Sequence, residues 1–384
     1  MLVVAIGVGT GVGVNSLIAR RLGEKRQEEA DSAAEHGVAL AVVGGIVFLV
    51  LGLTLSGAFI HAFGAAESVA SQSIEYSHIA VAFSIFVLIS MMCEKIQQST
   101  GNMIIPMCQG LAGAIINIIL DPLMIFGIGP FPAMGIEGAA LATGLGQSVT
   151  LLVYLVLCVT RPLPVHISVR LMKPGRDILP RIYSIGVPAA LNIALPSLLI
   201  AALNVLLASF SETYILVLGI YYKLQTFLYL PANGIVQGMR PVIGYNYGAG
   251  ERARVRRIYR VALAMSGVIM AAGTLICLLV PGTLMGLFTS SETTIAAGET
   301  ALRLISIGFI VSSVSVISAG ALEGLGKGTQ SLVISLCRFV VIIIPASFLL
   351  SHALGAVGVW HAFWISELLT AVVSLVICRR TLKL

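Results

Sequence analysis

Charged residues are scarce in this sequence. Asp, Glu, Lys and Arg make up 10% of the 384 residues, whereas hydrophobic residues make up 58%. About a quarter of an ordinary soluble chain is charged, and a disordered chain needs a low hydrophobic content. A soluble protein of this composition would expose large apolar patches and aggregate. The composition therefore excludes soluble and disordered proteins and leaves a membrane protein.

The sequence also lacks the motifs of enzymes and metal sites. It contains no H-E-x-x-H, no Walker loop, no G-x-S-x-G and no Asp-rich diphosphate motif, and its histidines are dispersed. The six cysteines lie in or beside apolar segments without C-x-x-C spacing, which favours buried thiols over a disulfide framework. We therefore expect neither an enzymatic activity nor a cofactor.

Long apolar runs occupy most of the chain. A membrane-spanning helix needs about 20 apolar residues, and segments such as 38–55 and 332–350 are apolar all round, which excludes the alternation of a β-barrel. The runs predict an all-α, polytopic membrane protein with 11 spans. These spans are expected at 2–19, 36–60, 73–95, 104–127, 136–160, 180–208, 213–240, 257–280, 296–320, 329–351 and 356–378.

The basic residues predict the orientation. Loops rich in Lys and Arg stay in the cytoplasm, and 19 of the 23 basic residues fall in alternate connections or in the C-terminal tail. The others, Lys223, Arg240, Arg303 and Arg338, lie within spans or near their ends. We expect a multi-pass protein of the plasma membrane with a cytoplasmic C-terminus. The net charge of +6 then lies beside anionic lipid, and no nucleic-acid partner is needed.

The two halves of the sequence repeat. Gly13 and Gly238, Gly23 and Gly248, and Gly101 and Gly326 are each 225 positions apart, whereas Gly135 and Gly355, and Gly138 and Gly358, are 220 apart. The first copy thus carries five extra residues around 126–133. Such repeats build many transporters. We expect an N-terminal lobe of five spans at 1–160, a cytoplasmic linker at 161–180 and a C-terminal lobe of six spans at 181–384.

The repeat also bears on the odd number of spans. The second copy begins with the span at 180–208, and its counterpart in the first copy would precede residue 1. We therefore expect about 11 spans of a 12-helix architecture, with an apolar first helix encoded directly upstream of Met1.

One acidic residue stands out within the spans. Only three Asp residues occur, and Asp121 alone lies inside a long apolar segment, where an ionisable group is expensive and is a functional candidate. Asn117 lies on the same helix face, and Thr143 of the adjoining span adds a hydroxyl. Pro122 has no N–H, so the carbonyl of Ile118 loses its helical partner. These oxygens predict a site for Na⁺ or for a proton on Asp121.

Other polar residues are weaker candidates. Lys223 and Gln225, with Tyr221 and Tyr222, suggest a polar, stacking patch that faces a cavity, although an aromatic-rich helix more often serves packing. Three further acidic residues are expected to be half-solvated helix-end residues rather than ligands. They are Glu94, Glu323 and Glu367.

Several segments resemble one transporter family. The stretches GAIINIILDPLMIFGIG and GIEGAALATGLGQ, the paired loops LIARRLGEKR and IGYNYGAGERARVRR, and GLGKGTQ are similar to the multidrug and toxic compound extrusion (MATE) transporters over essentially the whole chain. The resemblance implies a two-lobed helix bundle that exports amphipathic, often cationic drugs by alternating access in exchange for Na⁺ or H⁺. We expect it to act as a monomer.

The resemblance also assigns residues. By position, Asn117, Asp121 and Thr143 correspond to the cation site of the family's first lobe, and the absent first helix is the one that supplies a further acidic residue. The acidic residues found in the second lobe of one subfamily would fall near Pro196 and Ser312, so this chain lacks them. Coupling is therefore expected to depend on Asp121.

Some of these features also fit other families and functions. LIARRLGEKR also resembles a loop of the major facilitator transporters, but Arg20 stands where that motif has Asp, and the NIILDP span has no place there. A lipid-linked oligosaccharide flippase shares the MATE architecture. A membrane enzyme and a non-transporting truncated remnant are the further readings, since a fold alone does not determine function.

Overall fold

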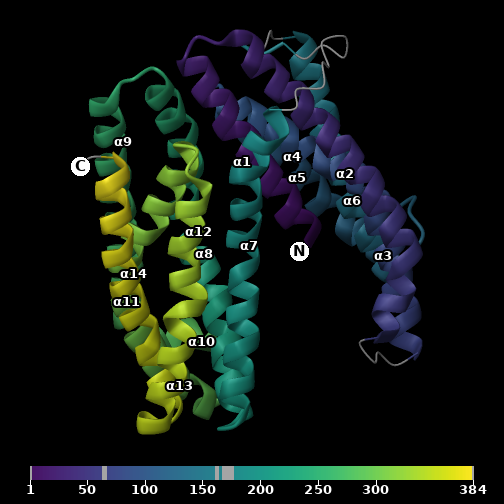
Figure 1. The fold of residues 1–384 in the computed structure, drawn as a ribbon. Coiled ribbons are helices and arrows are strands. Elements are labelled where there is room, and N and C mark those ends of the chain that lie inside the picture. Colours follow the sequence, from purple (N-terminus) through teal and green to yellow (C-terminus); the bar gives the residue numbers. More distant parts are fainter. Residues whose placement is uncertain (1, 63–66, 161–163, 167–176, 383–384) are drawn as a thin grey trace. The chain divides into compact units, whose positions relative to one another are not determined.

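The computed structural model describes residues 2–62, 67–160, 164–166 and 177–382, and its secondary structure within these ranges is helical, without β-strands (Figure 1). In these ranges 10 helices are long and apolar enough to cross a membrane, or 11 if one bent pair is counted as a single span. The predicted all-α polytopic fold is confirmed, and each predicted span coincides with an observed helix or broken helix.

The chain divides into two compact units, which we call unit 1 (residues 1–21 and 26–186) and unit 2 (residues 22–25 and 187–384). Most of the expected linker at 161–180 lies outside the described residues. The assignment of the lobes to 1–160 and 181–384 therefore stays a prediction. Unit 1 contains α1 (Leu2–Gly23), α2 (Gln27–Ala62), α3 (Glu67–Ala82), α4 (Ser84–Ser99), α5 (Ile104–Phe126) and α6 (Gly135–Thr160).

Unit 1 is built around close helix pairs. α5 packs against α6, α2 packs against α3 and α4, and both α3 and α4 reach α6. The chain bends by 46° between α3 and α4, a pair with the length and composition of one broken span or of a re-entrant loop. α1 approaches α4 closely because it carries glycines at the contact: a Cβ on Gly11 would lie 2.6 Å from Lys95 Cγ. Small residues permit such contacts between membrane helices.

Unit 2 contains the remaining helices. They are α8 (Glu212–Gly248), α9 (Arg252–Leu279), α10 (Pro281–Gly286), α11 (Glu292–Gly324), α12 (Gly328–Leu336), the π-helical turn η2 (Cys337–Val341), α13 (Ile343–Leu354) and α14 (Ala356–Leu382), together with most of α7 (Ile178–Ala208). α11 is central, because it packs against α8, α9 and α14 (Figure 1). The core at this junction includes Leu218, Phe309 and Trp360.

Many large apolar side chains remain exposed on the helices. On α2, Val43, Val50 and Leu55 each expose more than half of their surface, at 57%, 54% and 53%. Apolar helix surfaces of this kind suit hydrocarbon, where every backbone N–H and C=O is already satisfied within the helix. The protein is accordingly a multi-pass membrane protein.

The cysteines only partly match the expectation of buried thiols. The five cysteines whose side chains are described are all free, and Cys93, Cys277 and Cys378 are buried. Cys337 is half-buried and Cys108 is exposed, which corrects the prediction for these two positions. Cys108 lies on α5 among other exposed apolar side chains, where a thiol behaves as a small apolar group. The side chain of Cys158 lies outside the described residues.

The backbone confirms the internal repeat. Residues with positive φ recur at the predicted spacing: Lys25 (60°) and Gly250 (80°), and Gly101 (84°) and Gly326 (77°), are 225 positions apart, and Gly135 (54°) and Gly355 (63°) are 220 apart. α2 and α9 begin at equivalent positions, Gln27 and Arg252, and α4 and α11 end at equivalent positions, Ser99 and Gly324. These turns and helix ends recur at the predicted spacing, so the spacing assigns equivalent positions in the two copies.

Candidate functional site

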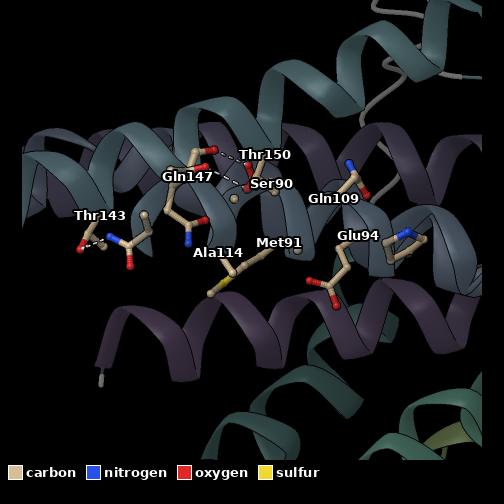
Figure 2. A pocket seen from close by; sticks show the side chains of 13 residues that line it. Ser90, Met91, Glu94, Gln109, Ala114, Thr143, Gln147 and Thr150 are labelled. Atoms are coloured by element: carbon tan, nitrogen blue, oxygen red, sulfur yellow. Dashed lines mark hydrogen bonds between the residues drawn. The ribbon is translucent and has the colours of Figure 1, made fainter. Parts of the chain in front are cut away.

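Unit 1 contains a cavity of about 340 Å³ between α4, α5 and α6 (Figure 2). Polar side chains supply much of its wall. In Figure 2, Thr143 lies at one end of the cavity and Glu94 and Gln109 lie at the other. The lining residues are Ser90, Met91, Glu94, Pro106, Gln109, Gly110, Gly113, Ala114, Asn117, Thr143, Gly146, Gln147 and Thr150.

Two glycines set the distance between α5 and α6 beside this cavity. A Cβ on Gly146 would lie 2.9 Å from the carbonyl oxygen of Gly113, and a Cβ on Gly113 would collide with Thr150 Oγ1. The hydroxyl of Thr150 instead donates to the carbonyl oxygen of Gly146 at 2.9 Å. The helix backbones therefore touch at this level, and the polar residues on either side of the contact are left to line the cavity.

The structure brings the three predicted cation-site residues together. Asn117 Nδ2 lies 3.2 Å from Asp121 Oδ1, one turn further along α5, and 3.4 Å from Thr143 Oγ1 on α6. Asn117 and Thr143 line the cavity, whereas Asp121 lies just outside its wall. The side chain of Asn117 therefore connects the carboxylate of Asp121 to the cavity. The functional role of the three residues stays a prediction.

The local backbone adds one further oxygen to this group. α5 continues past Pro122 to Phe126 and ends at Gly127, whose left-handed conformation (φ 70°) lets its N–H bond to the carbonyl of Leu123. Because Pro122 has no N–H, the carbonyl of Ile118 lacks its usual helical partner. Carboxylate, amide, hydroxyl and carbonyl oxygens are the ligands of a hard cation, and a carboxylate can alternatively take a proton. The residues present thus fit either Na⁺ or a proton.

Other metals find less support in the described ranges. No group of three or more His, Cys, Asp and Glu side chains gathers there in an arrangement that would hold a metal ion. The candidate site instead has a single carboxylate with neutral oxygen groups around it.

Glu94 and Gln109 form the other polar end of the cavity. Glu94 is 36% exposed and accepts from Gln98 Nε2 at 2.7 Å and from Lys95 Nζ at 3.0 Å. This matches the expected half-solvated position, but the residue also faces the cavity. Gln109 is 3% exposed, and its Oε1 accepts no hydrogen bond from the described part of the chain. Sequence reasoning did not select Gln109, although an amide within an apolar span was the available signal.

The second predicted patch is not a single surface. Tyr221 is 1% exposed and packs edge-on against Phe363, so it belongs to the core of unit 2. Tyr222 contacts the Tyr221 ring at a centroid distance of 5.2 Å. Lys223 is exposed and its ammonium lies 5.9 Å from the Phe288 ring centroid, while Gln225 is half-buried. The role of these four residues in a substrate cavity stays a prediction.

Two acidic residues expected at half-solvated helix ends are buried in ion pairs instead. Glu323 is 5% exposed and lies 2.6 Å from Arg240 Nη2. Glu367 lies 2.7 Å from Arg338 Nη2, and its side chain is 14% exposed. The prediction was wrong for both, because the basic partner comes from another helix and cannot be recognised from the acidic residue's own segment.

The sequence is similar to a known protein family. The MatE family model matches residues 1–123 and 188–349. The multidrug export protein MepA of Staphylococcus aureus (strain MRSA252) is 25% identical over 376 residues, which are 97% of this chain and 82% of MepA.

Solved structures are similar over the whole chain. An outward-facing multidrug resistance MATE family transporter of the MOP superfamily has a TM-score of 0.95 and 26% identity, covering 100% of this chain and 85% of that one. A MOP superfamily transporter from Pyrococcus furiosus Vc1, described as having a binding pocket of reverse polarity that suggests a different function, has a TM-score of 0.94 with the same identity and coverage. From the matched family model, the relatives and the shared fold, the chain belongs to the MatE family, which places it among the MATE transporters rather than among enzymes.

Proposed function

We propose that this protein exports amphipathic, often cationic drugs or toxic compounds by alternating access, in exchange for Na⁺ or H⁺. The observation that carries the proposal is the position of Asn117. Its amide contacts Asp121, the candidate ion-binding carboxylate, and also lines the cavity in which a small molecule would bind. Ion and drug would therefore act on the same side chain.

The chemistry of the cavity supports a small cationic substrate. Its volume of about 340 Å³ lies in the range of pockets that bind drug-sized molecules. Glu94 Oε1 already accepts from Lys95 and Gln98, so its Oε2 is the part of the carboxylate offered to a cationic group. The amide of Gln109 offers an acceptor for an N–H group, and Met91 offers a polarizable apolar surface. A lipid-linked oligosaccharide is far larger than this space, so the cavity favours drug export over a flippase.

Coupling follows from competition for the Asn117 amide. When Asp121 is ionised and empty, its carboxylate accepts the hydrogen bond from Asn117 Nδ2. A proton or Na⁺ on Asp121 weakens this bond, which frees Asn117 to turn toward Thr143 and changes the cavity wall. Ligands are coupled when they prefer different arrangements of one element. The ion-bound arrangement would thus bind the drug more weakly and release it.

The setting of the protein is part of the proposal. We place the protein in the plasma membrane, and the basic connections favour an orientation with the C-terminus in the cytoplasm. We propose that the protein acts as a monomer and needs no cofactor, with Na⁺ or H⁺ as its coupling substrate.

The decisive experiment uses purified protein in proteoliposomes with ethidium as the transported cation. An imposed proton or Na⁺ gradient is expected to drive ethidium transport by the wild type, and Asp121→Asn is expected to abolish the gradient dependence. Asp177→Asn is the matched control, because Asp177 is exposed at the start of α7 and lies outside the cavity. Gradient-driven transport that persists in Asp121→Asn would contradict the assignment of the ion site.

The alternative functions predict different results in the same vesicles. A flippase would move a fluorescent lipid-linked oligosaccharide between leaflets and leave ethidium behind. A non-transporting remnant would move neither compound. Either result with folded, reconstituted protein would overturn the proposed drug export.

A further inference from the structure

Unit 2 contains a buried ion pair in the middle of a membrane span. Arg338, in the π-helical turn η2, places Nε and Nη2 each 2.7 Å from Glu367 Oε1 on α14. The two side chains are only 11% and 14% exposed. Arginine stays protonated at physiological pH, so the pair consists of a permanent cation and a carboxylate.

Further groups from α8 and α11 complete the surroundings of this pair. Ser315 Oγ lies 3.4 Å from Glu367 Oε2, and the guanidinium lies 3.4 Å from the hydroxyl of Tyr229. That hydroxyl is itself 2.7 Å from Ser312 Oγ. The guanidinium also lies 5.6 Å from the centroid of the Tyr229 ring, within cation–π range. The cation is therefore held from several helices rather than by one carboxylate.

The repeat shows what occupies the same place in unit 1. With the spacing of 225 positions before the extra segment and 220 after it, Arg338 is equivalent to Gly113 and Glu367 to Gln147. Ser315 is equivalent to Ser90 by the same spacing. These three unit 1 residues all line the cavity. Unit 2 thus has a guanidinium–carboxylate pair where unit 1 has open space.

Contacts in the two units support this register. In unit 1, Gly146 touches the carbonyl oxygen of Gly113, where an added Cβ would lie 2.9 Å away. In unit 2, the equivalent Ser366 donates from its hydroxyl to the carbonyl oxygen of Arg338 at 3.2 Å. The same two positions therefore meet in both units, although the side chains differ.

The residues around the ion pair also differ between the two units. Tyr229 and Ser312, which support the guanidinium, correspond to Val4 and Val87 in unit 1 by the spacing that precedes the extra segment. At this position unit 1 therefore lacks both the tethered cation and the Tyr229–Ser312 pair beside it. The Lys95–Glu94 ion pair of unit 1 lies at other positions of the repeat. Unit 1 keeps Ser90 and replaces the carboxylate by the neutral amide of Gln147.

We propose that Arg338 is a tethered cation that occupies, in unit 2, the position that unit 1 leaves open for a diffusible cationic ligand, and so keeps Glu367 out of ion exchange. The part that concerns unit 1 rests on the proposed function. The part that concerns unit 2 stands on the ion pair alone, because a carboxylate already neutralised by a permanent cation has no vacancy for a diffusible cation.

The first test replaces the tethered cation by a free one. Arg338→Ala leaves Glu367 facing the space of the lost guanidinium, and methylguanidinium added to the purified full chain in detergent is expected to raise its Tm by about 2 °C. The wild type should not respond, nor should Arg338→Ala/Glu367→Gln. Arg303→Ala is the matched control, since Arg303 pairs with Glu299 at an exposed site. An equal response of the double variant, or no response of folded Arg338→Ala, would overturn the proposal.

The second test uses a variant without an unpaired charge, so it can be carried out even if Arg338→Ala does not fold. Arg338→Met/Glu367→Gln removes both charges while keeping similar side-chain lengths. We expect the same number of coupling ions per exported ethidium as in the wild type. A smaller number would show that the pair exchanges an ion and would overturn the proposal. Because the methylguanidinium test requires no transport, it still decides the role of Arg338 if the wild type exports nothing.

Discussion

Asn117 donates a hydrogen bond through Nδ2 to Asp121 Oδ1 at 3.2 Å while its side chain forms part of the cavity wall in unit 1. A single amide therefore joins a carboxylate in a membrane helix to the space where a ligand would bind. A second contact, at 3.4 Å to Thr143 Oγ1, extends the connection to α6. This arrangement determines which substitutions separate binding of the ion from binding of the drug.

Asn117→Ala is expected to uncouple transport from the ion gradient. The substitution removes the donor to Asp121 and the contact with Thr143, and a hydrogen bond to a charged group contributes about 1.5–3 kcal/mol. We expect gradient-driven ethidium transport in proteoliposomes to fall by about tenfold or more. Asn246→Ala is the matched control, because Asn246 Nδ2 bonds to the carbonyl of Val242 within α8. Unchanged coupling in Asn117→Ala would argue against a role for this amide.

Glu94→Gln is expected to weaken binding of cationic compounds selectively. Glu94 lines the cavity and pairs with Lys95 Nζ at 3.0 Å, and the amide keeps the size of the side chain while removing the negative charge that faces both Lys95 and the cavity. The KM for ethidium should rise by about tenfold, as expected for the loss of one charge-assisted contact, whereas the KM for a neutral substrate should stay the same. Glu75→Gln on α3 controls for removal of a carboxylate from an exposed position. An equal rise for both substrate types would indicate a structural effect.

Glu323→Gln is expected to destabilise unit 2. Glu323 accepts from Arg240 at 2.6 Å and from Asn192 at 2.9 Å, and loss of one partner of a buried ion pair costs about 3–5 kcal/mol. The Tm of the variant in detergent should fall clearly below that of Glu299→Gln. The latter breaks an exposed pair with Arg303, and such pairs contribute about 0–1 kcal/mol. Equal Tm values for the two variants would contradict the structural importance of the buried pair.

Gly250→Ala is expected to destabilise the turn between α8 and α9. Gly250 has φ 80°, where a Cβ costs about 1–2 kcal/mol, and Lys25 occupies the equivalent position in the first copy of the repeat with φ 60°. Lys25→Gly should therefore leave the Tm unchanged or raise it. Gly267→Ala within α9 is expected to raise the Tm instead, because a Cβ there meets open space and alanine favours the helix by about 0.5–1 kcal/mol. A Tm of Gly250→Ala at or above the wild-type value would contradict the expected strain.

Some features of the fold were accessible from local patterns. The apolar runs identified the spans, since the length of a membrane helix is set by the bilayer and every backbone group must be satisfied within the helix. Helix periodicity placed Asn117 and Asp121 on one face, and the structure joins them by a hydrogen bond. Repeated glycines gave the register of the two copies, and the positive φ angles at Gly101 and Gly326 follow it.

The cavity could not be predicted in the same way. Glu94, Gln109 and Gln147 come from three different helices, and only the packing of α4, α5 and α6 makes them neighbours. The closeness of α5 to α6 depends on Gly113 meeting Gly146, a contact between two different helices. No periodicity within one helix specifies such a pair.

The membrane class, the helical spans and the pairing of Asn117 with Asp121 follow from the sequence, because they depend on composition or on residues within one or two helical turns. The two-copy repeat follows from it as well, because recurring residues can be aligned without knowledge of the packing. The tertiary structure alone decided the pairings between helices. In the sequence, Arg338 is a basic residue within a span and Glu367 was expected to be a half-solvated helix-end residue. Only the packing of η2 against α14 makes them one ion pair. A lone charge within a membrane span is expensive, and only the packing of the helices brings the two charges together.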